Sequence, residues 1–400
     1  MREIVRLAAR GDGVTVSGEH VAGGVPGDQV DPDGSIIRGE HHVEPPCRHF
    51  ERCGGCQLQH ADETVLHSFV RERVAGAARG QGLAVGHWLD AHLSPPHSRR
   101  RATMHGLREK RRAVLGYRQG RSHQIVDLAE CPVIERGLMA LVAPLRNLIG
   151  RHGGKNSIDV GLTMSDQGVD VGLSNLELDG LAATEDALEF ARSHDLARLT
   201  VDQGYGADVL WEPEPTTMTL SGLPVALPPG AFLQATADAE AVMAADAREW
   251  VAGSSNIVDL FAGLGTFAFA LASAGEAGRR IAAVEAERSA HLACKTAAAR
   301  TGGTVAALHR DLFRNPLQPS ELQRFDAALL DPPRAGARAQ IEQIAASELS
   351  RVVYVSCNPS SWARDAEKLI EGGFVLEKVR PVGQFRWSTH VELISLFVRT

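Results

Sequence analysis

The sequence lacks an apolar run that could cross a membrane or serve as a secretion signal. Its most apolar long window, Ile257 to Gly275, carries Asp259 and several glycines, which are out of place in a membrane span. The first residues, MREIVRLAARGDG, contain no signal-peptide core. Internal repeats and low-complexity tracts are also missing. We therefore expect a cytoplasmic protein that does not contact a membrane.

Cysteine is scarce, with six residues in a chain of 400. In a cytoplasmic protein, so few cysteines are more typical of metal ligands or catalytic groups than of a disulfide framework.

Excess positive charge is missing as well, because the net charge is −7. One segment, 99–121, departs from this balance and carries a single acid, Glu109. Such a run can be a solvated, salt-bridged surface or a patch that contacts phosphates. The sequence leaves both interpretations open. The nine basic residues are Arg99, Arg100, Arg101, Arg108, Lys110, Arg111, Arg112, Arg118 and Arg121.

The order of patterns along the chain predicts three segments, 1–44, 45–230 and 231–400. The first has short apolar runs between Gly-Asp-Gly and Pro-Gly-Asp turns, which is typical of a small β-barrel. The second mixes strands with helices, including a helix at about 62–80. The third alternates strands and helices and ends in two strands, as in a doubly wound α/β domain with antiparallel closing strands. Its expected elements are a helix at 235–252 and strands at 257–261, 280–285, 304–308, 325–330, 352–355, 374–380 and 392–399.

The first strand of this third segment leads into a glycine turn, IVDLFAGLGTFAFALA. The turn lacks a full dinucleotide fingerprint. Glu285 ends the next strand, where a carboxylate can accept hydrogen bonds from both ribose hydroxyls of an adenosine. Asp311 follows the third strand and can reach the adenine amine. These acids favour S-adenosylmethionine over a pyrophosphate cofactor; the alternative is a strand–helix turn without a ligand.

The fifth strand ends on Cys357, in YVSCNPSSWARD. A cysteine at a strand tip can be a small buried hydrophobe or a nucleophile. The fourth strand ends in LLDPPRAGA, a loop that methyltransferases use to hold a base. Adenine-N6 methyltransferases have an aromatic residue where this chain has Arg334, which disfavours methylation of an amine.

A thiol at this place has a use in methylating carbon 5 of uracil. This carbon is too weak a nucleophile unless a thiolate first adds to carbon 6, and a base must later remove the carbon 5 proton. Glu392, in STHVELISLF, is the candidate base, and His390 lies on the same strand face. Considered alone, Glu392 would be read as a surface acid at a strand end.

Cys47, Cys53 and Cys56 are clustered in CRHFERCGGCQLQH, and Cys131 follows in LAECPVIE. Four thiolates can bind zinc or an iron–sulfur cluster, and their spacing does not choose between them. Glycines 54 and 55 leave room for hydrogen bonds to sulfide, which favours the cluster. Cys294, in an alanine-rich helix pattern, is expected in the core.

Taken together, DLFAGLGTF, DPPRAGA, SCNPSSWARD and HVE resemble the bacterial RNA 5-methyluridine methyltransferases in order and spacing. FLQATADAE resembles the segment of that family that contacts substrate and cofactor. The resemblance implies that Cys357 is the nucleophile and Glu392 the base. The family often has Asn at the positions of Thr236 and Thr266, and a Pro-containing run before its glutamate. The residues implied around S-adenosylmethionine and the target base are Gln234, Phe261, Thr266, Glu285, Asp311 and Asp331.

The resemblance extends to the branch that acts on 23S ribosomal RNA, in which such cysteines bind a [4Fe–4S] cluster; zinc is the alternative. It implies that Cys47, Cys53, Cys56 and Cys131 are the ligands and that the cluster is structural, since this methyl transfer needs no electron. The segments RLAARGDGV and VPGDQV resemble the TRAM domain, a small RNA-binding barrel.

We therefore expect a class I methyltransferase domain, a central α+β iron–sulfur domain and an N-terminal TRAM- or OB-like barrel. The expected protein is a monomer that methylates a uridine of 23S ribosomal RNA, after that base leaves its stack. The alternatives are methylation of the transfer RNA T-loop and a non-catalytic RNA-binding protein with a redox-sensing cluster.

Overall fold

The computed structural model describes residues 1–109, 112–120 and 122–399, and these form two compact units. The chain passes between the units more than once. The first unit comprises Met1–Phe69, Leu93–Thr216 and Phe385–Thr389, and the second comprises Val70–His92, Thr217–Gln384 and His390–Thr400. Helix α1 (Glu63–Gly80) begins in the first unit and ends in the second. The predicted division into 1–44, 45–230 and 231–400 stays a prediction.

The first unit contains two sheets. The N-terminal sheet has the strand order β3-β2-β1-β4-β5, with β3 and β5 at its ends, so closure into the predicted barrel stays a prediction. Its strands are β1 (Arg2–Leu7), β2 (Gly13–Thr15), β3 (His20–Val21), β4 (Gln29–Val30) and β5 (Ile36–Ile37).

The second sheet of this unit has the order β10-β9-β8-β11-β12-β13-β14. Helix α3 packs its apolar residues Leu145 and Ile149 into the core of this sheet. The elements are β8 (Arg101–Glu109), β9 (Arg112–Arg118), β10 (Ile125–Asp127), α2 (Arg136–Ala140), α3 (Val142–His152), β11 (Ile158–Ser165), β12 (Gly168–Ser174), α4 (Gly180–Ser193), β13 (Arg198–Asp202) and β14 (Ala207–Trp211).

The second unit is built on a large sheet with the order β19-β18-β17-β20-β21-β23-β22-β6, in which β7 also pairs with β22. The first five of these strands are parallel, and β23 runs antiparallel to both β21 and β22. The strands are β6 (His87–Trp88), β7 (His92–Leu93), β17 (Asn256–Leu260), β18 (Arg280–Glu285), β19 (Val305–His309), β20 (Ala327–Leu330), β21 (Arg351–Ser356), β22 (Phe374–Gly383) and β23 (Glu392–Arg399). The predicted α/β domain with antiparallel closing strands is confirmed.

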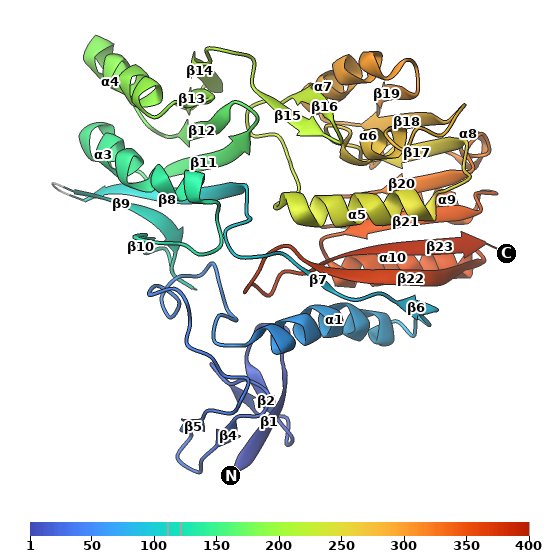
Figure 1. Ribbon diagram of the computed structural model, residues 1–400, viewed down its shortest axis with the longest axis horizontal. Helices are drawn as coiled ribbons and strands as arrows, with labels where there is room; N and C mark the ends of the chain where they lie inside the picture. The colour runs from blue at the N-terminus through green and yellow to red at the C-terminus, as the bar shows by residue number, and fades with distance from the viewer. Residues whose placement is uncertain (110–111, 121, 400) are drawn as a thin grey trace. The chain divides into compact units, whose positions relative to one another are not determined.

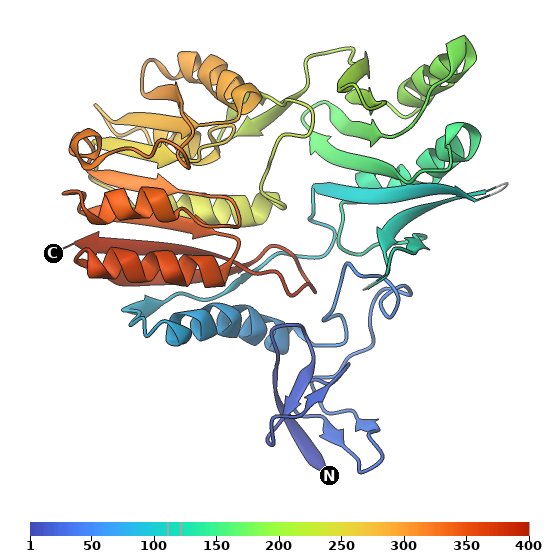
Figure 2. The ribbon, with the colours of Figure 1, turned by 180° about the vertical axis from the view of Figure 1, so that it is seen from behind.

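Helices cover both faces of this sheet, which explains why β20 and β21 are buried along almost their whole length. Helices α5 and α6 lie on the face toward the viewer in Figure 1, and α9 and α10 lie on the face toward the viewer in Figure 2. Strands β15 (Thr217–Leu220) and β16 (Leu223–Ala226) form a separate hairpin. The helices are α5 (Ala237–Trp250), α6 (Thr266–Ala272), α7 (Arg288–Ala298), α8 (Pro319–Leu322), α9 (Arg338–Ala345) and α10 (Pro359–Glu371), with a 3₁₀ turn at Ala299–Thr301.

Within the described ranges, no helix is both long and apolar enough to span a membrane.

Candidate active site

The predicted site residues of the second unit follow the carboxyl ends of its parallel strands. The register pairs Leu260 of β17 with Val284 and Leu330, and it pairs Leu330 with Tyr354. The strands therefore end side by side, and the loops after them meet at one edge of the sheet. This is where ligands bind in open α/β sheets.

The turn after β17 is open at Gly263, where a Cβ would meet nothing within 4 Å, and closely packed at Gly265. Gly265 has φ +92°, and a Cβ there would lie 2.6 Å from Phe269 Cε2 and 2.9 Å from Cys294 Sγ. Only glycine fits this position without strain. Thr266 begins α6 directly after it. Cys294 is buried in the core, as expected.

Glu285 is held rigidly beside this turn. Its Oε2 accepts a hydrogen bond from the Gly263 N–H at 2.8 Å, and its Oε1 accepts from the N–H groups of Ala286 and Glu287 at 2.7 and 2.6 Å. These backbone donors fix the carboxylate at the tip of β18. The structure thus places Glu285 next to the glycine turn, where the sequence predicts a ribose contact.

Phe261 and Asp311 come together across the same edge. The Phe261 ring lies 5.3 Å from the ring of Phe313, centroid to centroid. Asp311 Oδ1 accepts hydrogen bonds from the N–H groups of Phe313 and Arg314 at 2.9 and 3.2 Å. The backbone of Phe261 has φ +63°, a left-handed conformation that an aromatic residue seldom adopts. Phe313 is half exposed and was not singled out from the sequence.

Asp259 is fully buried beneath the glycine turn. Its Oδ2 accepts a hydrogen bond from the Ala268 N–H at 2.8 Å, while its Oδ1 has no hydrogen-bond partner among the described residues. Burial, followed by the charge of Glu285, raises the pKa of Asp259 to about 8. A buried oxygen without a partner is costly. The open position at Gly263, above this oxygen in the same turn, leaves room for a ligand.

Cys357 and Glu392 face each other at the ends of neighbouring strands. Antiparallel β21 and β23 pair Ser356 with Leu393, so the next position in this register sets Cys357 opposite Glu392. Burial, the charge of Glu392 and the charge of Asp331 raise the pKa of the Cys357 thiol to about 11. At neutral pH this pKa favours the thiol over the thiolate.

The two carboxyl groups beside this thiol, those of Glu392 and Asp331, also have raised pKa values. Glu392 is buried, with 4% exposure, and burial raises its pKa to about 7. The pKa of Asp331 lies well above its ordinary value because of burial and the nearby Glu392 and Asp259. Gln234 Nε2 donates a hydrogen bond to Asp331 Oδ2 at 2.8 Å. A carboxyl group poised near neutrality suits a general base.

The loop that carries Asp331 and Arg334 is fixed against α10. Asp365 Oδ2 accepts hydrogen bonds from the Tyr354 hydroxyl at 2.6 Å and from the Ala337 N–H at 2.8 Å. The Arg334 carbonyl accepts from Asn358 Nδ2 and Ser361 Oγ, both at 3.1 Å. These contacts hold the loop of the motif DPPRAGA against the turn and helix of the motif SCNPSSWARD. Sequence reasoning missed Tyr354 and Asp365, which lie in apolar or helical patterns without a chemical signature.

Gln384 was also missed. It directly follows β22, eight positions before Glu392, and its side chain is 2% exposed. A single glutamine after a strand carries no sequence signal. Only the fold shows that it lies between Gln234 and Glu392.

The four predicted metal ligands lie in the first unit and influence one another. Burial first, and then the charges of neighbouring thiols, raise the pKa values of Cys47, Cys53 and Cys56; that of Cys56 reaches about 12. Cys131 contributes to each of these three shifts. The chain thus brings Cys131 near the cysteines of the segment 47–56.

These thiols do not form a metal-binding arrangement in this conformation. Over the part of the chain that the structure describes, no group of three His, Cys, Asp or Glu side chains could hold a metal ion. A Cβ on Gly55 would lie 3.5 Å from Cys53 Sγ, so the glycine leaves space beside that sulfur. The donor set, four thiols, suits a cluster, and the cluster itself stays a prediction.

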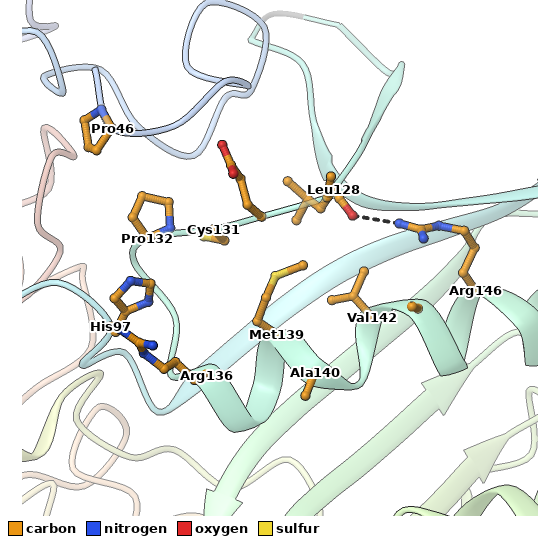
Figure 3. A pocket seen from close by; sticks show the side chains of 13 residues that line it. Pro46, His97, Leu128, Cys131, Pro132, Arg136, Met139, Ala140, Val142 and Arg146 are labelled. Carbon is orange, nitrogen blue, oxygen red and sulfur yellow. Dashed lines mark hydrogen bonds between the residues drawn. The ribbon is translucent and has the colours of Figure 1, made fainter. Parts of the chain in front are cut away.

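Cys131 also lines a hollow of about 700 Å³ within the first unit (Figure 3). Pro46, His97, Arg136 and Met139 surround it. Apart from Pro46 and His97, its lining residues come from helices α2 and α3 and from the segment 128–132 before them, which carries Cys131.

Only some of the basic side chains in the run 99–121 are exposed on the surface. Lys110, Arg111 and Arg121 lie outside the described residues. Arg100 is buried, with 5% exposure, and burial lowers the pKa of Arg101. Arg100 therefore does not belong to an exposed surface, because its side chain lies inside the unit. The RNA-contacting interpretation of the run stays a prediction for its exposed members. The exposed members among the described residues are Arg108, Arg112 and Arg118.

Comparisons with known proteins bear on this arrangement. The family described as tRNA (uracil-5-)-methyltransferase matches residues 226–400. An RNA methyltransferase of Zymomonas mobilis, itself uncharacterized, is 46% identical over the full length of both chains. The chain belongs to the RNA uracil-C5 methyltransferase family. It is therefore an RNA (uracil-5-)-methyltransferase, and the alternative of a non-catalytic RNA-binding protein falls away.

Two further relatives differ in their RNA. A 23S rRNA (uracil(1939)-C(5))-methyltransferase of Pectobacterium carotovorum is 34% identical, covering 91% of this chain and 82% of the relative. The crystal structure of a Pyrococcus abyssi tRNA (uracil-54, C5)-methyltransferase with S-adenosyl-L-homocysteine has a TM-score of 0.76. It covers 100% of this chain and 99% of its own at 20% identity. The second match shows a shared fold and supports the methyltransferase architecture.

The raised pKa of Glu392 predicts a pH-dependent effect of Glu392→Gln on stability. A carboxyl whose pKa rises on folding from 4.5 to about 7 stabilises the fold below pH 4.5, and this contribution is lost as the pH rises to 7. The amide avoids the cost of burying a charge. Glu392→Gln should therefore raise the free energy of unfolding at pH 8 by on the order of 2–3 kcal/mol, and far less at pH 5. Urea unfolding at both pH values measures this.

Glu348→Gln, at an exposed position of the same unit, is the control for the change of charge. If Glu392→Gln raised the free energy of unfolding by the same amount at pH 5 and pH 8, the raised pKa of Glu392 would be contradicted.

Proposed function

We propose that this enzyme uses S-adenosylmethionine to methylate carbon 5 of a uridine in 23S ribosomal RNA, through a covalent bond between Cys357 and carbon 6. The observation that carries the proposal is the register that sets Cys357 opposite Glu392, beside Asp331, at the edge where the parallel strands end. One thiol and one buried carboxyl group at about pKa 7 are the nucleophile and base that this reaction requires.

The cofactor would lie over the glycine turn. Glu285 would accept hydrogen bonds from the ribose and Asp311 from the adenine amine, with Phe261 beside the ring. Thr266, Gln234 and Asp331 would complete the surroundings of the cofactor and the target base. When bound, S-adenosylmethionine supplies an electrophilic methyl group. The unpartnered Asp259 oxygen and the open position at Gly263 support a ligand at this place.

The protein residues carry the remaining chemistry. The Cys357 thiol gives its proton to solvent, and its sulfur bonds to carbon 6. The electron pair of the C5–C6 double bond then moves to carbon 5 and the carbon 4 oxygen, which makes carbon 5 nucleophilic. After carbon 5 is methylated, Glu392 takes the proton from carbon 5. The electrons of that C–H bond form the C5–C6 double bond and expel the Cys357 thiolate. The neighbouring Arg334 favours the thiolate, since it lowers the pKa of Cys357 against the larger effects of burial and the two carboxyl groups.

Cys357→Ala should reduce methylation below detection, because the pyrimidine is no longer activated. The dissociation constant for S-adenosylhomocysteine, measured by calorimetry, should stay within about twofold of the wild-type value. The thiol follows β21, whereas the proposed cofactor contacts follow β17, β18 and β19. Glu392→Gln should instead accumulate a protein–RNA adduct, visible as a slower band on a denaturing gel. Turnover by Cys357→Ala would refute the nucleophile, and absence of the adduct in Glu392→Gln would assign proton removal to another group.

The 23S target rests on the Pectobacterium relative, because its 34% identity exceeds the 20% of the transfer RNA enzyme of like fold. We infer that RNA also contacts the N-terminal sheet and the exposed arginines of the basic run, and that the protein acts as a monomer in the cytoplasm. Transfer RNA is the second candidate, supported by the matched family's name.

Nucleoside mass spectrometry of cells with and without the gene separates these substrates. We expect the loss of one 5-methyluridine from a 23S fragment and none from transfer RNA. The reverse result would keep the reaction and replace the substrate.

We further propose that Cys47, Cys53, Cys56 and Cys131 bind a structural [4Fe–4S] cluster. Their mutual effects on pKa and the space beside Gly55 support this arrangement. Protein purified without oxygen should contain about four iron atoms per chain and absorb visible light. Cys131→Ser should lose both properties, whereas Cys294→Ser, a buried thiol of the other unit, should keep them. Zinc in place of iron would favour the alternative metal, and unchanged iron in Cys131→Ser would exclude Cys131 as a ligand.

A further inference from the structure

A chain of buried amides joins the two carboxyl groups of the candidate active site. Gln384 Nε2 donates a hydrogen bond to Gln234 Oε1 at 3.1 Å, and Gln234 Nε2 donates to Asp331 Oδ2 at 2.8 Å. At the other end lies Glu392: strands β22 and β23 pair it with Val382, two residues before Gln384, and the Gln384 amide acts to lower the pKa of Glu392. Gln234 and Gln384 are each 2% exposed, so water does not compete for these contacts.

The direction of every hydrogen bond in this chain follows from one backbone group. The Ala235 N–H, which can only donate, is bonded to Gln384 Oε1 at 2.9 Å. This oxygen is therefore the acceptor, and the amide nitrogen of Gln384 must face Gln234 and Glu392. Gln234 then accepts through its oxygen, and its nitrogen faces Asp331. Asp331 thus receives an N–H donor from Gln234, and the second N–H of the Gln384 amide is left to face Glu392.

We propose that Gln384 is a positioning residue for the base. It holds one oxygen of Glu392 as a hydrogen-bond acceptor and, through Gln234, links the orientation of Glu392 to that of Asp331. This inference rests on the proposed function, in which Glu392 removes the carbon 5 proton.

The role has a definite chemical consequence. Only the ionised Glu392 can take the proton, and burial favours its neutral form. An N–H donor stabilises the carboxylate and opposes this effect, in agreement with the direction in which Gln384 shifts the pKa of Glu392. The donated hydrogen bond occupies one oxygen and leaves the other for the proton of carbon 5. The proton is then released to solvent after the thiolate has left.

The test uses Gln384→Met, which keeps the length of the side chain and removes both its donor and its acceptor. Breakdown of the covalent adduct is followed between pH 6 and 9 in single-turnover reactions on the target RNA. At pH 7 we expect breakdown to slow about tenfold, as for one lost hydrogen bond to a charged group. We expect the pH midpoint to rise by about one unit, with recovery at high pH, because fewer Glu392 side chains are ionised at pH 7.

Gln340→Met is the matched control. Gln340 is also buried, with 1% exposure, and its amide bonds to the N–H and the carbonyl of Leu317 at 2.8 and 3.1 Å. It should lose comparable stability and keep the wild-type pH midpoint. A slowed Gln384→Met enzyme with an unchanged midpoint would make Gln384 merely structural and overturn the proposal.

Gln384→Glu provides a second variant of nearly native shape, which carries the test if Gln384→Met does not fold. It keeps an acceptor for the Ala235 N–H and places a carboxyl oxygen toward Glu392, so the midpoint should rise further than in Gln384→Met. A midpoint at or below the wild-type value would contradict the role. If the wild-type enzyme forms neither adduct nor 5-methyluridine, the proposed function itself fails; a wild-type enzyme that is active beside unshifted variants rejects only the role of Gln384.

Discussion

Two buried carboxyl groups lie beside one thiol, and their burial limits how many of the three groups can be charged at the same time. Asp331, Cys357 and Glu392 each have a raised pKa, and each of the first two is raised further by the charge of Glu392. Like charges so close together in a dehydrated place cannot all be present. The free enzyme therefore carries fewer charges than it has groups. Formation of the Cys357 thiolate becomes coupled to the protonation of its neighbours, and so to the arrival of substrate.

Such a site needs rigid surroundings, because a small displacement would let water reach the side chains of Asp331, Cys357 and Glu392. These surroundings have two parts. The Tyr354 hydroxyl and the Ala337 N–H hold Asp365 and with it the loop of Asp331. The amides of Gln384 and Gln234 hold the opposite side. The strands alone set the register, and these polar contacts set the orientation of the side chains.

The sequence predicted the elements of the second unit closely, because buried parallel strands leave apolar runs that end in polar residues. The predicted strands at 280–285 and 392–399 coincide with β18 and β23. Cys357 could be singled out because it stands at a strand tip, whereas Glu392 became a candidate only through the chemistry that a cysteine there would serve. Gln234 came only from a resemblance, and Gln384 was missed, because an amide becomes informative only when its partners are known. The burial of Arg100 was missed since a run of like charges does not show which member turns inward.

Several energetically unfavourable features lie at the carboxyl ends of the parallel strands. Their location is an argument for function that does not depend on any resemblance. Phe261 adopts a left-handed backbone, and Asp259 buries an oxygen without a partner among the described residues. Each costs on the order of 1–3 kcal/mol. The carboxyl groups near Cys357 add the cost of dehydration. A stretch selected for stability alone would not concentrate these costs within two neighbouring loops. They are understandable if this edge of the sheet serves the binding of a nucleoside and a pyrimidine and not the stability of the fold alone.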